Sequence, residues 1–241
     1  MDLKEVYIWN VKFNLLSAKE IVLIVNEWLA EGRKGVHLTG VDACVLVQAQ
    51  KDDLLRKAIL ESDIVNVDSY LPAKKLAQRG YAIRERVTTP DLMEEFFRMA
   101  NDKEQKVFLF GAKESTIQLL VDVLAKEYPN MKIVGYRNGY YTSEEESEIV
   151  DQISSLGPDY LFIGMPSPRK EHFILKYKDK INVGMLLGVG GAFDAKAGIM
   201  KRPPKFLRGH MGEAFFRIIR NPKQYGSRLL YLFPFLRITR Q

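Results

Sequence analysis

Residues 183–228 read VGMLLGVGGAFDAKAGIMKRPPKFLRGHMGEAFFRIIRNPKQYGSR, and this stretch sets the expected fold. Positions 183–189 form a continuous apolar run, which is typical of a strand buried on both faces of a parallel sheet. Gly188, Gly190 and Gly191 stand at the end of that run. Glycines there let the backbone approach a ligand and favour a phosphate or sugar-nucleotide pocket, with a plain tight turn as the alternative. We expect the carboxylate of Asp194 at the same edge of the sheet.

The chain changes character from residue 201 onward. This segment carries ten lysines or arginines against Glu213 alone, a net charge of +9, and interleaves them with seven aromatic residues. The mixture predicts attachment to an anionic membrane surface, with nucleic acid as the competing polyanion. The basic residues that we assign to the membrane or to a lipid-bound acceptor are Lys201, Arg202, Lys205, Arg208, Arg220, Lys223 and Arg228.

The composition predicts a folded protein of the cytoplasm. The 241 residues are 46% hydrophobic and 27% charged, which suits one sizeable core. Cys44 is the single cysteine, so a disulfide framework is excluded. The first residues lack a signal-peptide pattern, and no apolar run reaches the ~18 residues of a spanning helix. We therefore expect a peripheral protein on the inner face of the plasma membrane.

Strand and helix patterns alternate along the first 195 residues. Strands are expected at 6–11, 35–38, 63–67, 106–110, 132–136 and 159–164. A Ser17–Glu20 capping box begins a helix at 18–31, and Thr89 is expected to cap a helix at 89–101. Residues 166–170, with two prolines and two cations, are expected to form a rigid basic loop at a strand end. The alternation predicts an α/β fold, a mostly parallel Rossmann-like sheet flanked by helices. We expect residues 1–195 to form this core and residues 196–241 to form a basic, helical C-terminal appendage.

Polar residues follow several of the expected strands. Thr39 and Asp68 come after the second and third strands, where ligands collect in open α/β sheets. Asp68 is the candidate general base, with helix capping as the alternative. Gly111 begins a turn typical of nucleotide sites, and Tyr140 can stack on a base or plug a sheet edge.

Seven elements occur in an order that is similar to one known family. They are the strand that ends at Asp68, ERVTTPDL (85–92), KVFLFGAKES (106–115), YPNMKIVGYRNGYY (128–141), PDYLFIGMPSPRKEHF (158–173), GVGGAFDAKAG (188–198), and RPP (202–204) followed by GEAFFRIIRNPKQY (212–225). Together they resemble the bacterial glycosyltransferase family called after WecG, TagA and CpsF. The resemblance covers nearly the whole chain.

The resemblance implies an inverting, metal-independent transferase without a cofactor. Such enzymes move a hexose derivative, often N-acetylmannosamine, from UDP to a polyprenyl-diphosphate-linked sugar in cell-wall or surface-polysaccharide synthesis. The catalytic residues that it implies are Asp68, Thr39, Arg86 and Arg217. Those implied or expected at the donor are Tyr140, Asp194, Gly188, Gly190, Gly191, Gly111 and Lys170.

Departures from the family pattern bear on the donor. Ser69 follows Asp68 where glycine is usual, Val41 stands where an asparagine is expected, and Lys170 replaces a neutral amide. A cation at 170 makes a uronic acid donor an alternative to N-acetylmannosamine. No Asp-x-Asp pair occurs in the sequence, so a metal clamp is not expected.

Two rival functions can be weighed from the same residues. A nucleotide-dependent oxidoreductase would need a complete phosphate fingerprint, and neither glycine cluster supplies one. A nucleic-acid-binding α/β module that uses the basic tail is the second rival. The sequence leaves open whether the chain forms a homo-oligomer.

Overall fold

The computed structural model describes residues 3–200 and 226–240, and positions 212, 216, 218, 219 and 222 between them. Its centre is a six-stranded sheet in the order β4-β3-β8-β7-β5-β6, in which every pairing is parallel. The strands are β3 (Val36–Val41), β4 (Ile64–Val67), β5 (Lys106–Gly111), β6 (Lys132–Arg137), β7 (Tyr160–Gly164) and β8 (Met185–Gly188). The predicted α/β fold with a parallel sheet is confirmed.

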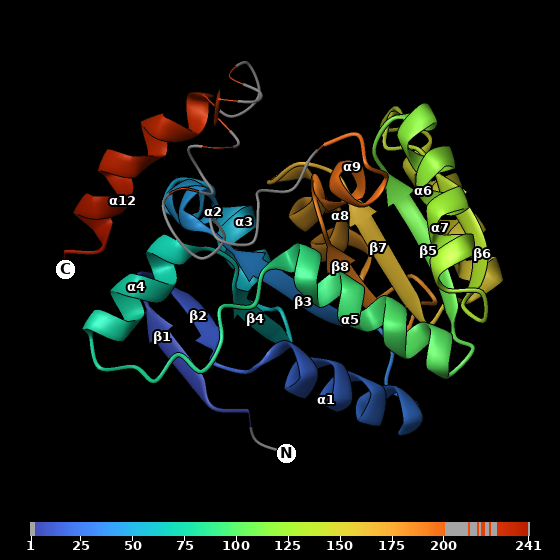
Figure 1. Cartoon of the computed structure of the whole chain (residues 1–241), viewed down its shortest axis with the longest axis horizontal. Helices are drawn as coiled ribbons and strands as arrows, with labels where there is room; N and C mark the ends of the chain where they lie inside the picture. The colour runs from blue at the N-terminus through green and yellow to red at the C-terminus, as the bar shows by residue number, and fades with distance from the viewer. Residues whose placement is uncertain are drawn as a thin grey trace.

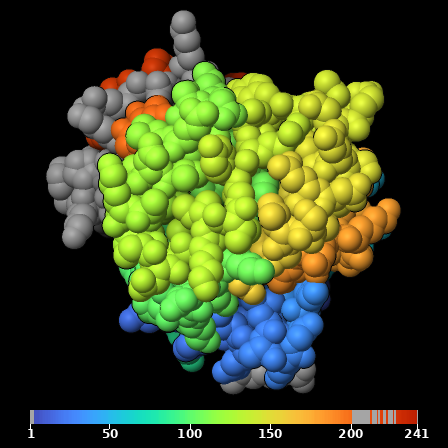
Figure 2. All heavy atoms as spheres, turned by 90° about the vertical axis from the view of Figure 1, so that its right-hand side faces the viewer, coloured from blue at the N-terminus to red at the C-terminus, as the bar shows by residue number. Residues whose placement is uncertain are grey.

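Helices cover both faces of this sheet (Figure 1). One face packs against α1 (Ala18–Ala30), α5 (Thr89–Asp102) and α6 (Glu114–Glu127). The other carries two separate apolar clusters, one with α2 (Ala43–Ala49), α3 (Asp53–Leu60) and α4 (Tyr70–Gln78), the other with α7 (Glu146–Leu156) and α8 (Arg169–Tyr177). Figure 2 shows the side where α6, in yellow-green, and α7, in yellow, form part of the surface.

The chain begins with a hairpin that the sequence pattern did not predict. The expected strand at 6–11 is two strands, β1 (Glu5–Ile8) and β2 (Val11–Asn14), which pair antiparallel. Trp9 and Asn10 turn the chain between them with φ of 54° and 59°. Hairpin turns of this left-handed kind usually contain glycine, and tryptophan rarely adopts them. The local sequence therefore does not indicate the turn.

Two helix starts follow the capping chemistry of the sequence. Ser17 and Glu20 form the predicted capping box at α1, with Ser17 N donating to Glu20 Oε2 at 2.7 Å. At α5 the cap is Thr88 rather than Thr89, because the Thr88 side chain accepts from Asp91 N at 3.3 Å. Thr89 is thereby left as the first helical residue, with its N–H free for a partner outside the helix.

The last helix returns to the beginning of the chain. After η2 (Gly226–Tyr231), α12 (Leu232–Ile238) lies beside α2 (Figure 1). Phe235 is fully buried in the cluster that holds Trp9 and Phe13 of the hairpin. The division of the chain at residue 195 stays a prediction, but the end of the proposed appendage is part of the core.

Candidate active site

Most of the predicted site residues of the described chain lie at one edge of the sheet. Parallel strands all end on the same side, and the crevice outside these ends is where open α/β sheets bind ligands. Asp68 follows β4, Gly188 ends β8, and Gly111 ends β5. From β4 to β5 is four strand spacings, roughly 19 Å, which suits a ligand as long as a sugar nucleotide.

Asp68 is held by the first turn of α5. Its Oδ1 accepts a hydrogen bond of 2.5 Å from Thr89 N. Helix N-termini carry partial positive charge, so this contact stabilises the ionised carboxylate and fixes its direction. Gly40 of β3 makes the approach feasible, since a methyl group at residue 40 would overlap the Thr89 hydroxyl. Asp68 does not cap the helix that follows it, because the N-cap of α4 is Ser69.

Thr39 lies on the opposite face of the sheet from Asp68. The strand β3 continues to Val41, so Thr39 is inside the strand rather than at its end. Its neighbour Gly40 pairs with Asn66 and shares the face of Asp68. Because side chains alternate along a strand, Thr39 points the other way. The structure therefore does not bring these two predicted catalytic residues together.

The Thr39 hydroxyl belongs to a buried hydrogen-bond chain. Ser62 Oγ donates to Ala58 O at 2.8 Å, so Thr39 Oγ1 donates to Ser62 at 2.8 Å and accepts from His37 Nε2 at 2.9 Å. Burial, reinforced by Lys178, Lys170 and Lys12, lowers the pKa of His37 to about 3. The imidazole is thus neutral at physiological pH and orients the threonine.

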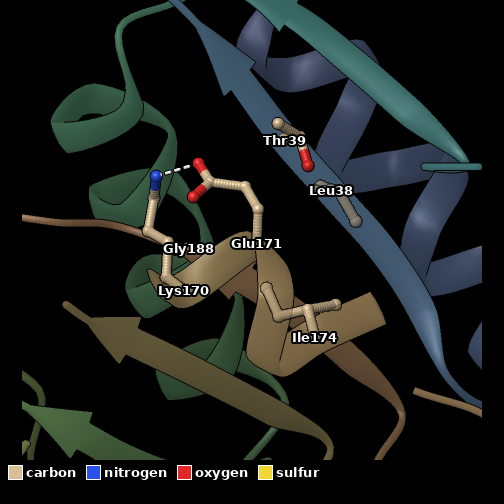
Figure 3. Close-up of a pocket in the computed structure, with 6 residues that line it drawn as sticks. All are labelled: Leu38, Thr39, Lys170, Glu171, Ile174 and Gly188. Atoms are coloured by element: carbon tan, nitrogen blue, oxygen red, sulfur yellow. Dashed lines mark hydrogen bonds and ion pairs between the residues drawn. The ribbon is translucent and has the colours of Figure 1, made fainter. Parts of the chain in front are cut away.

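Lys170 is buried near Thr39, at the position where α8 begins (Figure 3). Its ammonium forms an ion pair with Glu171 and a hydrogen bond with Ser167, and its aliphatic stem lies across Gly188. The narrow recess between these residues is lined by Leu38, Thr39, Lys170, Glu171, Ile174 and Gly188, and it leaves no room for a sugar nucleotide. The cation at position 170 is neutralised within the protein.

Four glycines lie where β5, β6, β7 and β8 end, and we call them the glycine floor: Gly111, Gly139, Gly164 and Gly190. Gly111, with φ of 132°, lies so close to Gly164 that a side chain at 111 would strike the backbone. A methyl group on Gly139 would stand 3.0 Å from Gly111 Cα, and one on Gly190 would stand 3.7 Å from Met165 O. Gly111, Gly139 and Gly164 are buried, so the missing side chains let the connections after β5, β6 and β7 pack tightly on one another, and Gly190 beside them is half-buried.

Two residues that we predict to bind the sugar-nucleotide donor follow glycines of this floor in the chain. Tyr140 is 67% exposed, and its N–H donates to Asn138 Oδ1 at 2.9 Å. Asp194 lies in α9 (Ala192–Lys196), where one carboxylate oxygen accepts from Thr116 Oγ1 at 3.4 Å, and Gly191 is the N-cap of that helix. Tyr140 therefore offers an open ring, and Asp194 is steadied by α6.

An ion-pair cluster links α9 to both α5 and α6. Lys196 Nζ lies 2.8 Å from Glu94 of α5 and 2.5 Å from Glu127 of α6. Tyr128 OH donates to Glu94 at 2.6 Å, and Lys196 lies 5.1 Å from the Tyr128 ring. The helix that carries Asp194 is thus tied to the helix whose first N–H holds Asp68.

The remaining predicted residues divide between the described chain and the rest. Arg86 is half-buried in the connection that leads to Thr88, three residues before Thr89, whose N–H holds Asp68. Arg228 forms an ion pair of 3.4 Å with Asp42, the N-cap of α2. The other basic residues assigned to catalysis, membrane or acceptor lie outside the described residues: Lys201, Arg202, Lys205, Arg208, Arg217, Arg220 and Lys223.

The described residues also bear on metal binding and on membrane spanning. Within residues 3–200, 226–240 and the isolated positions, no three His, Cys, Asp or Glu side chains gather closely enough to hold a metal ion. None of the helices in this described part is both long and apolar enough to cross a bilayer.

Sequence reasoning missed several residues that shape this edge. Thr89 was recognised as part of a helix start, but its contact with Asp68 joins segments 21 residues apart. Gly40 gave no signal because it lies inside a strand. The predicted basic loop at 166–170 is in fact where α8 begins, and the turn buries Lys170 while Arg169 stays exposed.

Comparison with known proteins places these features in one family. The model of the Glycosyl transferase WecG/TagA/CpsF family matches residues 6–241. Three relatives carry the name N-acetylglucosaminyldiphosphoundecaprenol N-acetyl-beta-D-mannosaminyltransferase. The chain is 34% identical to that of Bacillus subtilis (strain 168) over 61% of its own length and 57% of the relative. It is 31% identical to that of Bacillus spizizenii (strain W23) over 81% and 76%, and 29% identical to that of Staphylococcus aureus (strain MW2) over 68% and 66%.

The extent of these matches differs between the family model and single proteins. The chain spans less than two thirds of the Bacillus subtilis relative, whereas the family model covers nearly all of the chain. Because that model takes in both the strand ends and the C-terminal segment, the chain belongs to the WecG/TagA/CpsF family of glycosyltransferases.

Proposed function

We propose that the chain is an inverting, metal-independent glycosyltransferase that moves N-acetylmannosamine from UDP to N-acetylglucosamine linked to undecaprenyl diphosphate. The transfer would serve the synthesis of a cell-wall or surface polysaccharide. The observation that carries the proposal is the carboxylate of Asp68, fixed by Thr89 N at the ligand-binding edge of a parallel sheet. The names of the relatives supply the sugar and the acceptor.

Asp68 would act as the general base. It takes the proton from the acceptor hydroxyl while that oxygen attacks the anomeric carbon of the donor. The bond from this carbon to the diphosphate breaks, and UDP leaves with the electron pair from the opposite face. Inversion of an α-linked nucleotide sugar gives a β-linked product, which agrees with the β-mannosaminyl unit in the names of the relatives.

The leaving diphosphate would lie over the glycine floor. Backbone N–H groups after Gly190, together with Arg86 and Arg217, are our candidates for stabilising its charge without a metal. Tyr140 would stack on the uracil, and Asp194 would accept from a donor hydroxyl. The exposure of Tyr140 and the fixed position of α9 support this arrangement.

The pairing of Lys170 favours a neutral donor sugar. A uronic acid would need a free cation, and the Lys170 ammonium is already matched by Glu171. A buried ion pair that lost one partner to a ligand would leave the other charge unpaired, at a substantial cost. N-acetylmannosamine is therefore the donor sugar that we propose.

The C-terminal segment would hold the enzyme on the inner face of the plasma membrane. Leu229, Leu230 and Phe233 are 50%, 76% and 78% exposed in η2 and α12. Arg237 and Arg240 are exposed in the same final stretch. Apolar side chains beside cations suit the boundary of an anionic bilayer, and each cation near the surface contributes about 1 kcal/mol.

Turnover of defined substrates tests the proposal. Purified protein should transfer sugar from UDP-N-acetylmannosamine to N-acetylglucosamine-diphosphoundecaprenol, or to a short-chain analogue, and should ignore a UDP-uronic acid. A protein that transfers neither sugar, yet binds DNA more tightly than anionic liposomes across a salt series, would instead support the nucleic-acid-binding rival.

A further inference from the structure

Three connections converge beside the glycine floor, and one of them carries an exposed cation. Gly139 approaches Gly111 and Met165, which brings the loop after β6 against those after β5 and β7. Two residues beyond Gly139 stands Tyr141, and four beyond Met165 stands Arg169, the first residue of α8. Both residues thus lie at the edge of the sheet where strands deliver side chains to ligands.

Arg169 is held in place by Tyr141. The guanidinium carbon lies 4.2 Å from the centre of the Tyr141 ring, and NH2 donates to Tyr141 O at 3.4 Å. The ring itself packs against buried Phe110, with the two centroids 5.4 Å apart. Burial raises the pKa of Tyr141, so its ring stays neutral. A guanidinium stacked on a neutral aromatic face keeps its N–H edge free to meet an anion.

The neighbouring cation differs in its surroundings. Lys170 is buried and paired with Glu171, whereas Arg169 is exposed. In the part of the chain that the structure describes, no carboxylate lies within ion-pair distance of Arg169. Position 169 therefore presents an exposed positive charge, oriented by Tyr141, at the side of the sheet where the strands end.

We propose that Arg169, oriented by the Tyr141 ring, binds the diphosphate of the nucleotide. The inference rests on the proposed function and assigns to Arg169 a role that the sequence gave to other arginines. The planar guanidinium can donate two parallel hydrogen bonds to phosphate oxygens, which a lysine cannot. Bound there, it stabilises the charge that grows on UDP as the glycosidic bond breaks.

Binding of UDP, UMP and uridine, measured by calorimetry, tests this assignment. Arg169→Gln should weaken the binding of UDP about 10-fold to 100-fold, the usual effect of losing hydrogen bonds to a charged group. The binding of UMP should weaken less, and uridine should bind as it does to the wild type. Arg169→Lys should recover part of the UDP affinity, because it restores the charge without the planar donors.

A matched arginine supplies the control. Arg33 also stacks on an aromatic ring, that of Trp28, at 4.2 Å, but it precedes β3 and so lies at the opposite edge of the sheet. Arg33→Gln should leave all three affinities unchanged. Unchanged UDP affinity in Arg169→Gln, or equal losses for UDP and uridine, would overturn the diphosphate assignment. Wild-type protein that binds no UDP at all would overturn the proposed function itself.

The tyrosine tests the orienting role separately. Tyr141→Phe keeps the ring and the backbone carbonyl, so UDP affinity should stay near the wild-type value. Tyr141→Leu removes the stacking surface and should weaken UDP several-fold while uridine is unaffected, with a melting curve to confirm folding. Wild-type UDP affinity in a folded Tyr141→Leu protein would show that the ring does not orient Arg169.

Discussion

The backbone N–H of Thr89 and the carboxylate of Asp68 are joined by a hydrogen bond of 2.5 Å. This contact connects the end of β4 to the start of α5. The helix therefore fixes both the direction and the charge of the group that we propose as the base. The strength of this hydrogen bond and its dependence on Gly40 lead to the first two predictions.

Asp68→Asn should lower turnover by roughly 10²- to 10⁴-fold, the usual range for losing a general base. The amide oxygen of asparagine can still accept from Thr89 N, so the fold and the affinity for UDP should be retained. Steady-state kinetics beside UDP calorimetry make the comparison. Unchanged turnover in the folded variant, or a matching loss of UDP affinity, would remove the base assignment.

Gly40→Ala should reduce both stability and activity. The added methyl group would overlap the Thr89 hydroxyl and push the start of α5 away from Asp68, and overpacking of this kind costs about 1–3 kcal/mol. Urea unfolding and turnover measure the two effects. Gly226→Ala is the control, since a side chain at residue 226 has no described atom within 4 Å and should change neither quantity.

Two phenylalanines of α12 should separate core packing from membrane binding. Phe235 is fully buried and Phe233 is 78% exposed. Phe235→Ala should lower the free energy of unfolding by about 3–5 kcal/mol. Phe233→Ala should change it by no more than about 0.5 kcal/mol but weaken sedimentation with anionic liposomes. If Phe233→Ala sediments like the wild type, this face does not touch the bilayer.

His37 should make the fold less stable in acid. Its pKa lies near 3 in the folded protein and near 6.5 when exposed, so between these values the unfolded chain binds more protons. Stability should therefore fall as the pH drops from 6.5 toward 3, by up to about 1.4 kcal/mol per pH unit. Urea unfolding at pH 7 and pH 5 should show a larger loss for the wild type than for His37→Gln. Equal losses in the two proteins would contradict the buried, neutral histidine.

Activity should persist in EDTA. The sequence has no Asp-x-Asp pair, and we assign the charge of the leaving group to backbone N–H groups and arginines. Turnover should therefore be the same in EDTA, Mg²⁺ and Mn²⁺. Loss of activity in EDTA that a divalent ion restores would show that a metal shares this work.

The sequence predicted the sheet well because its signals are local. Apolar strand runs, the Ser17–Glu20 box and the order of strands and helices all depend on residues near one another in the chain. The hairpin was missed because Trp9 and Asn10 turn without glycine. The helix α8 was missed because Pro166 and Pro168 suggested a loop, although Pro168 is its N-cap.

The site was harder to predict because it depends on direction as well as position. Asp68 was placed correctly at a strand end, but Thr39 was placed there too. The strand β3 continues for two more residues, and the alternation of side chains puts Thr39 on the other face. Lys170 was read as a free cation because nothing local shows that Glu171 folds back to neutralise it. Each outcome depends on how distant segments pack, β3 against β4 for Thr39 and α8 against β8 for Lys170.

The burial of Phe235 among hairpin residues has a consequence for how the protein is made. The hairpin leaves the ribosome well before α12, yet both contribute to one apolar cluster. Domains generally fold from the N-terminus during synthesis, so the faces of α2 and of the hairpin remain uncovered until α12 has been made. A nascent chain that stops before α12 presents this apolar patch to chaperones and proteases, and only a chain that includes α12 can bury it.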